Sequence, residues 1–316
     1  MEPIKLGVSA CLLGRNVRYD GGHKRDAYIV ETLGNFFSFV PVCPEVEFGL
    51  PIPRESMRLV GDPEAPRLVT TRSGKDLTEG MLAFCEKRAE ALTGEKLRGF
   101  IFKKDSPSSG LFRVKVYADG VPGRPGRGLF AAAVARRFPL LPLEEEGRLN
   151  DPALRENFIE RVFAYARLGE FLEGDPGPGG LVEFHTAHKL LVMSHSVALY
   201  RELGALVAGA GVRGADWKAI LGRYKELFMK ALALQATEKK NVNVLMHIMG
   251  YFKGVLSADE KAELLEIIGQ YKNRLVPLVV PLTLVKHYIR KYGEPYLAKQ
   301  FYLSPHPAEL MLRNRV

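Results

Sequence analysis

Two cysteines of this sequence directly follow short β-rich runs, where a thiol is accessible to a metal or a substrate. Cys11 ends the run formed by residues 4–10, and Cys43 ends the run formed by residues 36–42. A thiolate is both a soft metal ligand, suited to iron–sulfur clusters, and a nucleophile. One isolated cysteine at a strand end is more often a small buried apolar residue. Two cysteines at equivalent positions favour shared ligation.

The third cysteine, Cys85, has a different setting. It lies in residues 81–86, where its spacing to Leu82 and Ala89 predicts the buried side of a helix. An odd and sparse set of cysteines, all in the first half of the chain, does not form a disulfide framework. The three are therefore free thiols, metal ligands or nucleophiles, and burial in the core is favoured for Cys85.

Polar residues accompany these cysteines in the sequence. Glu45, two residues after Cys43, is able to polarise a water or protonate a leaving group if it lies beside a metal, although most such carboxylates are simply exposed. A third β-rich run, residues 97–102, ends in Lys103, Lys104 and the loop 105–110. The hydroxyl and N–H groups of that loop suit an anion or the edge of a base.

The elements that must position these residues alternate in type. Helical stretches at residues 25–33 and 78–92 separate the three β-rich runs. This alternation predicts a parallel, Rossmann-like α/β sheet. Ligands of such sheets bind outside the carboxyl ends of the strands, so we expect the three loops to converge on one crevice.

The amino-acid composition changes between residues 139 and 152, which contain a Pro/Leu stretch followed by an acidic run at residues 144–146. Asp151 followed by Pro152 is a strong helix start. We therefore predict an α/β domain at residues 1–147 and an all-α domain at residues 148–316. Helical stretches are predicted at residues 181–208, 216–237, 242–256, 257–271 (opened by a capping box of Ser257 and Glu260) and 283–292.

Composition and charge limit the possible classes of protein. Hydrophobic residues make up 47% and charged residues 26% of the 316 residues, which excludes a disordered or fibrous chain. No apolar span of about 20 residues and no secretory signal is evident, so we expect a cytoplasmic protein that does not enter a membrane. The net charge of +9 favours polyanionic partners such as nucleic acid.

The basic excess is larger in the second half of the chain. Residues 1–157 hold 24 basic and 21 acidic side chains, whereas residues 158–316 hold 21 and 15. Mixed basic and aromatic helices there suit contacts with phosphates and stacking on unpaired bases, with a solvated helix face as the alternative. The candidate RNA-binding residues are Arg124 and Arg127, just before a helix predicted near Leu129, and Lys239, Lys240, Lys286 and Arg290.

Three histidines, His185, His188 and His195, share one face of a predicted helix. Zinc motifs place a carboxylate and their ligands closer together than this spacing does. We therefore favour histidines that lie in the core or face RNA over a metal site.

Both halves of the sequence carry an ordered set of motifs. The motifs of the first half are Val8-Ser-Ala-Cys-Leu-Leu-Gly14, Arg18-Tyr-Asp-Gly-Gly22, Pro41-Val-Cys-Pro-Glu45, Ser106-Pro-Ser-Ser-Gly110 and Arg113-Val-Lys-Val-Tyr117. Those of the second half are Phe184-His-x-x-His-Lys-Leu-Leu191, His247-Ile-Met-Gly-Tyr-Phe252 and Leu275-Val-Pro-Leu278. With these motifs the first half resembles the TudS-type thiouracil desulfidase domain and the second half resembles the YbgA-type all-helical domain. Their fusion resembles the RudS-type family of two-domain tRNA thiouridine desulfidases.

The resemblance implies a 4Fe-4S cluster held by three cysteines, with one iron open to the sulfur of a thiocarbonyl. It implies Cys11 and Cys43 as ligands and Glu45 as the acid/base. It also implies Ser106 and Ser108 as hydrogen-bonding residues of the site, and Arg18, Tyr19, Asp20, Lys103 and Ser109 as substrate-binding residues.

The sequence departs from the family pattern at Ser109, where the third cysteine is typical. A serine oxygen is a poor ligand for a soft cluster iron. Either Cys85, the one spare thiol, is recruited, or a serine or non-protein ligand completes the site, or the cluster is absent or labile. We take Cys85 as the candidate third ligand.

The leading hypothesis is a desulfidase that removes sulfur from thiouridine, 4-thiouridine above all, in tRNA without net redox change. One alternative is desulfidation of free thiopyrimidines. The other is an RNA-binding protein that has lost its cluster; binding of that kind, dominated by phosphate contacts, must weaken steeply with salt.

Overall fold

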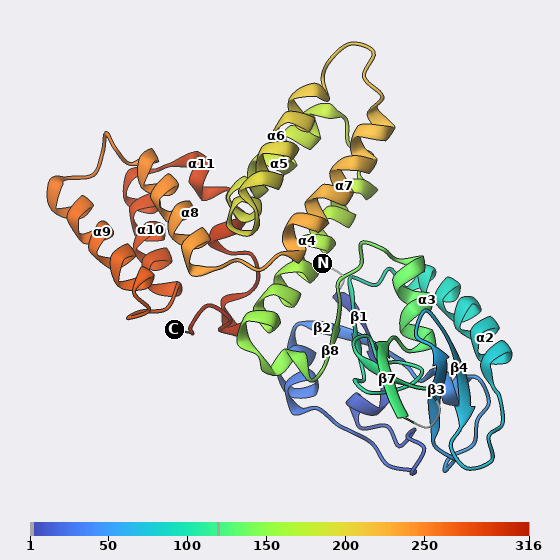
Figure 1. Cartoon of the computed structure of the whole chain (residues 1–316). Helices are drawn as coiled ribbons and strands as arrows, with labels where there is room; N and C mark the ends of the chain where they lie inside the picture. The colour runs from blue at the N-terminus through green and yellow to red at the C-terminus, as the bar shows by residue number, and fades with distance from the viewer. Residues whose placement is uncertain (1–2, 119–120, 316) are drawn as a thin grey trace. The chain divides into compact units, whose positions relative to one another are not determined.

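The computed structural model describes residues 3–118 and 121–315, and the chain divides into two compact units, residues 1–151 and 152–316 (Figure 1). Each unit has its own buried core of apolar side chains. No helix of the described residues is both long and apolar enough to cross a membrane.

The first unit is built around a parallel sheet. Four strands pair in the order β2-β1-β5-β8, and every neighbouring pair is parallel. The two central strands are almost continuously buried, as expected for a parallel sheet that is covered on both faces. The strands are β1 (Ile4–Ser9), β2 (Phe37–Val42), β5 (Gly99–Phe102) and β8 (Leu143–Glu145). The predicted parallel α/β fold is confirmed.

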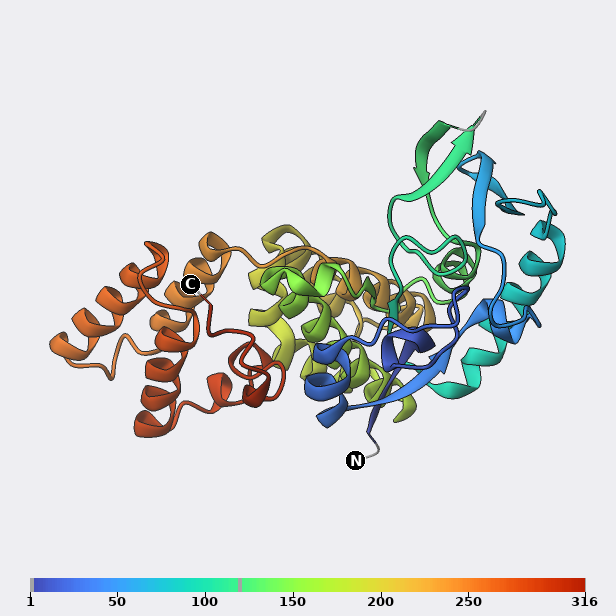
Figure 2. The ribbon, with the colours of Figure 1, turned by 90° about the horizontal axis from the view of Figure 1, so that it is seen from below.

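A second, mixed sheet was not predicted from the sequence. Its strands pair in the order β4-β3-β6-β7, with two antiparallel hairpins joined through the parallel pair β3–β6 (Figure 2). Prolines and charged residues interrupt the alternation of these strands, which hides their period in the sequence. The strands are β3 (Met57–Asp62), β4 (Ala65–Thr70), β6 (Val114–Ala118) and β7 (Val121–Gly126).

The helices of the first unit are α1 (Pro44–Glu47), α2 (Thr78–Ala91) and α3 (Leu129–Arg137). Helices α2 and α3 lie side by side (Figure 1). The helices predicted near residues 78–92 and from Leu129 are confirmed. The helix predicted at residues 25–33 is instead a π-helical turn, Tyr28–Thr32, followed by a 3-10 turn, Leu33–Asn35.

The second unit is helical throughout its described elements. Helix α4 begins at Pro152, as predicted, because proline suits the first position of a helix. The helices are α4 (Pro152–Glu173), α5 (Pro178–His195), α6 (Val197–Gly209), α7 (Trp217–Ala233), α8 (Glu238–Tyr251), α9 (Ala258–Lys272), α10 (Val279–Tyr292) and α11 (Pro295–Ala298).

Two local features set the helix ends of the second unit. The single helix predicted at residues 181–208 is divided at Ser196, whose backbone is extended and whose Oγ accepts a hydrogen bond from Leu199 N. The capping box predicted for Ser257 and Glu260 is confirmed, since each side chain accepts a hydrogen bond from the other residue's backbone N–H.

Candidate active site

The loops after β1, β2 and β5 meet at one cavity of about 410 Å³, called here the strand-end cavity. The three strands are parallel neighbours, so their carboxyl ends lie at the same edge of the sheet. The predicted convergence of the three loops is therefore confirmed. Residues 9–11, 43–45 and 103–109 line the cavity, together with Arg18, Tyr19 and Arg54.

Both strand-end thiols line this cavity. Cys11 lies in a 3-10 turn directly after β1 and is 8% exposed. Burial and the neighbouring Cys43 raise the pKa of Cys11 to about 11. Burial also raises the pKa of Cys43, which caps α1 and whose Sγ lies 3.8 Å from Val17 O. Two protonated, converging thiols become strong soft ligands once a metal displaces their protons.

Cys85 is not among the residues that line the cavity. It lies in α2, fully buried like Met81 and Ala89 on the same helix. Burial and the charge of Glu86 raise the pKa of Cys85 to about 12, so its thiol stays protonated. The structure thus does not bring this candidate third ligand to the other two thiols, and it gives Cys85 the core position that its helical spacing indicates.

Glu45 is held in place from two sides. Its Oε1 accepts a hydrogen bond of 2.7 Å from Ser108 Oγ, and its Oε2 accepts from Arg54, whose Nε lies 2.9 Å away. The same guanidinium donates to Val17 O at 2.9 Å. The carboxylate therefore has one orientation at the wall of the cavity, where it is able to accept or donate a proton.

The serine loop is fixed by the helix that follows β7. Ser108 O accepts hydrogen bonds from Phe130 N and Ala131 N at the start of α3. A Cβ on Gly128 would lie 2.6 Å from the Ser108 backbone, so only glycine permits this approach. Within the loop, Ser106 Oγ lies 3.1 Å from Ser108 Oγ and accepts from Ser109 N. Ser106, Ser108 and Ser109 all line the cavity.

The predicted substrate-binding residues lie at the mouth or the wall of the cavity, with one exception. Arg18, Tyr19, Lys103 and Ser109 line it, and Tyr19 is 45% exposed. Asp20 is not among the lining residues; its carboxylate instead accepts hydrogen bonds from Arg18 at 3.3 Å.

Sequence reasoning missed Arg54 and Glu146. Arg54 belongs to no recognisable motif. Its role depends on contacts with Glu45 and Val17, two residues that are distant from it in the sequence. Glu146 holds the Lys103 ammonium and accepts from Lys104 N at 2.8 Å. The sequence suggested that the acidic run at residues 144–146 marks a change of composition near a domain boundary. In the structure this run begins inside β8. A fourth apolar run, residues 140–143, was the available signal.

The candidate RNA-binding residues have different environments. Lys239 lines a shallow pocket of about 320 Å³ with Tyr200, Arg201 and His247. Lys240 also borders this pocket, but its Nζ donates to His195 O and Gln235 O at 2.7 and 2.8 Å, so its ammonium has a structural role.

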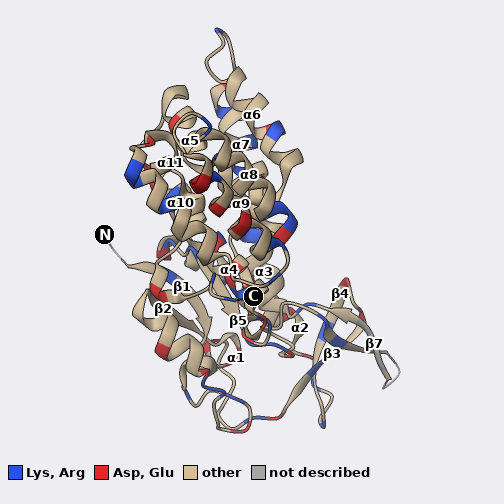
Figure 3. Ribbon diagram, turned by 90° about the vertical axis from the view of Figure 1, so that its left-hand side faces the viewer, with Lys and Arg blue, Asp and Glu red and all other residues tan. Residues whose placement is uncertain are grey.

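The other candidate RNA-binding residues lie elsewhere. Lys286 is half-buried and Arg290 is exposed, both on α10. Arg127 lines a groove of the first unit, and the Arg124 side chain lies outside the described residues. Figure 3 shows acidic residues interspersed with Lys and Arg in both units.

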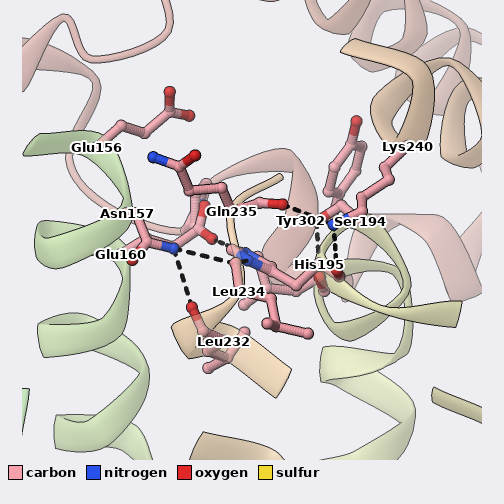
Figure 4. Close-up of polar contacts among 12 residues, drawn as sticks. Glu156, Asn157, Glu160, Ser194, His195, Leu232, Leu234, Gln235, Lys240 and Tyr302 are labelled. Carbon is pink, nitrogen blue, oxygen red and sulfur yellow. Dashed lines mark hydrogen bonds and ion pairs between the residues drawn. The ribbon is translucent and has the colours of Figure 1, made fainter. Parts of the chain in front are cut away.

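The three histidines of α5 are core residues, as favoured from the sequence. His195 contacts Glu160 through Nε2 and Leu234 O through Nδ1, which leaves neither ring nitrogen for a metal (Figure 4). His188 accepts a hydrogen bond of 3.1 Å from Arg167, and His185 lies 3.3 Å from the Tyr224 hydroxyl. Among the described residues, no three His, Cys, Asp or Glu side chains converge as a metal site.

Lowering the pH from 7 to 5 is expected to destabilise the helical unit by roughly 4 kcal/mol, at about 1.4 kcal/mol per pH unit for each of two histidines. Burial, with Lys189, lowers the pKa of His185 to about 4, and burial, with Arg167, lowers that of His188 to about 3. Below pH 6.5 the unfolded chain therefore takes up protons that the folded unit does not.

Urea unfolding followed by fluorescence of Trp217, the one tryptophan, reports on the helical unit because this residue lies in α7. Equal unfolding free energies at pH 7 and pH 5 would contradict the prediction.

Comparisons with known proteins assign both halves of the chain. A family model described as 2-thiouracil desulfurase matches residues 6–146, and one described as a protein of unknown function (DUF1722) matches residues 189–307. The uncharacterized protein YbgA of Escherichia coli (strain K12) is 31% identical over 162 residues, which cover 50% of this chain and 94% of YbgA. A solved structure described as the 4Fe-4S-dependent thiouracil desulfidase TudS is 32% identical, with a TM-score of 0.39, and covers 47% of this chain and 94% of its own.

Proposed function

This chain joins a 2-thiouracil desulfurase-family domain to a helical domain of the YbgA family, and from that premise we propose that it removes sulfur from 4-thiouridine in tRNA. In the net reaction, the thiocarbonyl of the base and one water give a carbonyl and hydrogen sulfide. No electrons are gained or lost. The first unit carries the chemistry, and the helical unit binds the tRNA.

One observation carries this proposal: two thiols and an anchored carboxylate share a single cavity at the carboxyl ends of a parallel sheet. Cys11, Cys43 and Glu45 come from two different loops, yet all three line the strand-end cavity. Thiolates bind a thiophilic metal centre, and a carboxylate transfers protons to and from water. Desulfidation by hydrolysis requires both groups next to the thiocarbonyl.

The donor set of the cavity fits an iron–sulfur cluster bound by two thiolates and one oxygen. Cys11 and Cys43 supply the thiolates, and Ser109 supplies a hydroxyl in the same cavity, where Cys85 does not reach. A 4Fe-4S cluster bound there supplies a Lewis-acidic iron for the sulfur of the substrate. With a hard oxygen in place of the third thiolate, we expect the cluster to be held weakly.

The protein residues orient the substrate and move the protons. Glu45 takes a proton from the attacking water through Oε1, the oxygen that Ser108 also contacts. Arg54 keeps the carboxylate pointed at the cavity, because its guanidinium is itself fixed by Val17 O. Tyr19, at the mouth, is placed to stack on the pyrimidine ring.

The tRNA part of the proposal is supported by charge. The excess of basic residues is larger in residues 158–316, and Lys239 and Arg201 border one pocket on the helical unit. Contacts of Lys and Arg with phosphates provide most of the affinity for nucleic acids. A base must also be unpaired to reach a metal centre inside this cavity, which costs a few kcal/mol unless the fold of the tRNA already supplies it.

The proposal predicts that anaerobically reconstituted protein releases equimolar sulfide from tRNA that contains 4-thiouridine. The measurement is loss of the thiocarbonyl absorbance together with sulfide release, with unmodified tRNA as the control. Free thiouracil is assayed in parallel, because the volume of about 410 Å³ also suits a single base. Activity on the free base alone would favour a thiopyrimidine desulfidase. Intact 4-thiouridine after incubation with cluster-replete protein would contradict the proposal.

A further inference from the structure

A second cavity of the first unit, of about 1170 Å³, adjoins the strand-end cavity. Lys104 and Asp105 line both cavities, so the two share a wall. We call this second cavity the basic groove. Its other basic and aromatic lining residues are Phe112, Arg113, Arg127, Arg136 and Arg148.

Cations outnumber carboxylates in the lining of the groove, although two of them, Arg136 and Arg148, are paired with Glu86 and Glu144. Five Lys or Arg and three Asp or Glu line it. One of the three acids, Glu145, is 5% exposed and accepts hydrogen bonds from Leu111 N and Phe112 N at 2.7 and 3.0 Å. Among the described residues, no carboxylate forms an ion pair with Lys104 or Arg113, so these cations are available to an anionic ligand.

An aromatic ring lies among these cations. Phe112 lines the groove and is 37% exposed, so part of its ring is accessible to a ligand. The Arg148 guanidinium carbon lies 4.7 Å from the centroid of its ring, and Glu144 Oε1 accepts a hydrogen bond of 2.7 Å from Arg148 Nε. An aromatic ring with a fixed guanidinium forms a platform on which a base is able to stack.

The turn that carries this platform is held in one conformation. Buried Glu145 fixes its two amides, and Arg127 Nε donates to Leu111 O at 3.2 Å. Arg113, the next residue, has a φ of 53°, a left-handed conformation that turns the chain sharply. A platform that is rigid before binding loses little conformational entropy when a ligand orders on it.

We propose that the basic groove binds the single-stranded nucleotides that flank the thiolated base. One flanking base stacks on Phe112 and Arg148, and the phosphates contact Arg113, Arg127 and Lys104. Groups of this kind, cations along a groove with an exposed aromatic ring, are how proteins hold single strands without reading their sequence. This inference rests on the proposed function, because it places the target base in the adjoining strand-end cavity.

The test measures binding to an unmodified single-stranded RNA of about twelve nucleotides, a length within the usual site sizes of such proteins. Fluorescence anisotropy compares the full wild-type chain with Phe112→Ala, Phe112→Leu and Arg113→Gln. The matched control is Arg72→Gln, which removes the same charge from an exposed site outside the groove. Heparin provides a polyanion that has no bases.

Phe112→Ala and Phe112→Leu are expected to weaken RNA binding about five-fold to a hundred-fold and to leave heparin binding unchanged, because only stacking is lost. Phe112→Leu keeps most of the apolar volume if the alanine variant unfolds. Arg113→Gln should weaken the binding of both RNA and heparin. It should also reduce the salt dependence of RNA binding by the amount that corresponds to about one phosphate contact. Arg72→Gln should behave as the wild type.

Wild-type RNA affinity in the Phe112 and Arg113 variants would overturn the inference. Equal weakening of RNA and heparin by Phe112→Leu would also overturn it, since the groove would then be a surface for polyanions or acidic proteins. Because the RNA carries no sulfur, these results are independent of activity. If the proposed desulfidase function is wrong, neither the wild type nor any variant releases sulfide, but the differences in RNA affinity among the variants remain.

Discussion

Alanine at Cys11 or Cys43 is expected to abolish both iron binding and sulfide release, whereas alanine at Cys85 leaves both intact. The first two thiols line the strand-end cavity, and Cys85 is fully buried in α2. Removing one of two soft ligands leaves too few thiolates to hold a cluster. The measurement is iron and acid-labile sulfide per chain after anaerobic reconstitution, with about four of each expected for a 4Fe-4S cluster.

Ser109 provides the internal control for this prediction. Ser109→Cys places a third soft ligand in the same cavity and should increase the iron that the protein retains against a chelator. Ser109→Ala should reduce it below the wild-type amount. A loss of iron in Cys85→Ala with retention in Cys43→Ala would contradict the assignment, because the ligand would then come from the core of α2.

The position of the site follows from features that the sequence displays locally. β1, β2 and β5 are short apolar runs, and each ends in residues that are unusual after a strand, namely Cys11, Cys43 and Lys103. Because β1 pairs in parallel with both β2 and β5, the carboxyl ends of these strands meet at one edge of the sheet. The identity of the loops was therefore sufficient to predict one crevice.

The geometry within the crevice depends on contacts that no local pattern encodes. Arg54 orients Glu45 from a loop nine residues away, and Glu146 holds Lys103 from the turn after β8, 43 residues later. The second sheet escaped prediction for a related reason, since prolines such as Pro66 interrupt the pattern of its strands and β3 pairs with β6, more than fifty residues later. Long-range pairing, which local propensity does not determine, decides both features.

The helical unit shows that residue type and spacing alone do not distinguish a core residue from a ligand-binding one. The spacing of His185, His188 and His195 on one helix face was equally compatible with RNA contact and with burial. All three are buried, because α5 is packed against α6, α7 and α8. Lys240 follows the same logic: its charge suggested a phosphate contact, but its ammonium joins two backbone carbonyls.

Glu45→Gln is expected to lower kcat about a hundred-fold to ten-thousand-fold, the usual contribution of a positioned acid/base, without changing the iron content. Glutamine keeps the shape of the side chain but is unable to accept a proton from water. The measurement is sulfide release from thiolated tRNA, with kcat and KM determined separately. The matched control is Glu90→Gln, which alters an exposed carboxylate paired with Arg137 on α2 and α3.

Glu45→Asp separates proton transfer from positioning. Aspartate retains the carboxylate but is one methylene shorter, so it loses optimal contact with Ser108 and Arg54. We therefore expect a kcat between those of Glu45→Gln and the wild type. Full activity of Glu45→Gln would contradict the role of this residue, and the proton would then have to pass through another group of the cavity. Lys103 is such a group, because it lines the same cavity and its ammonium is held by Glu146.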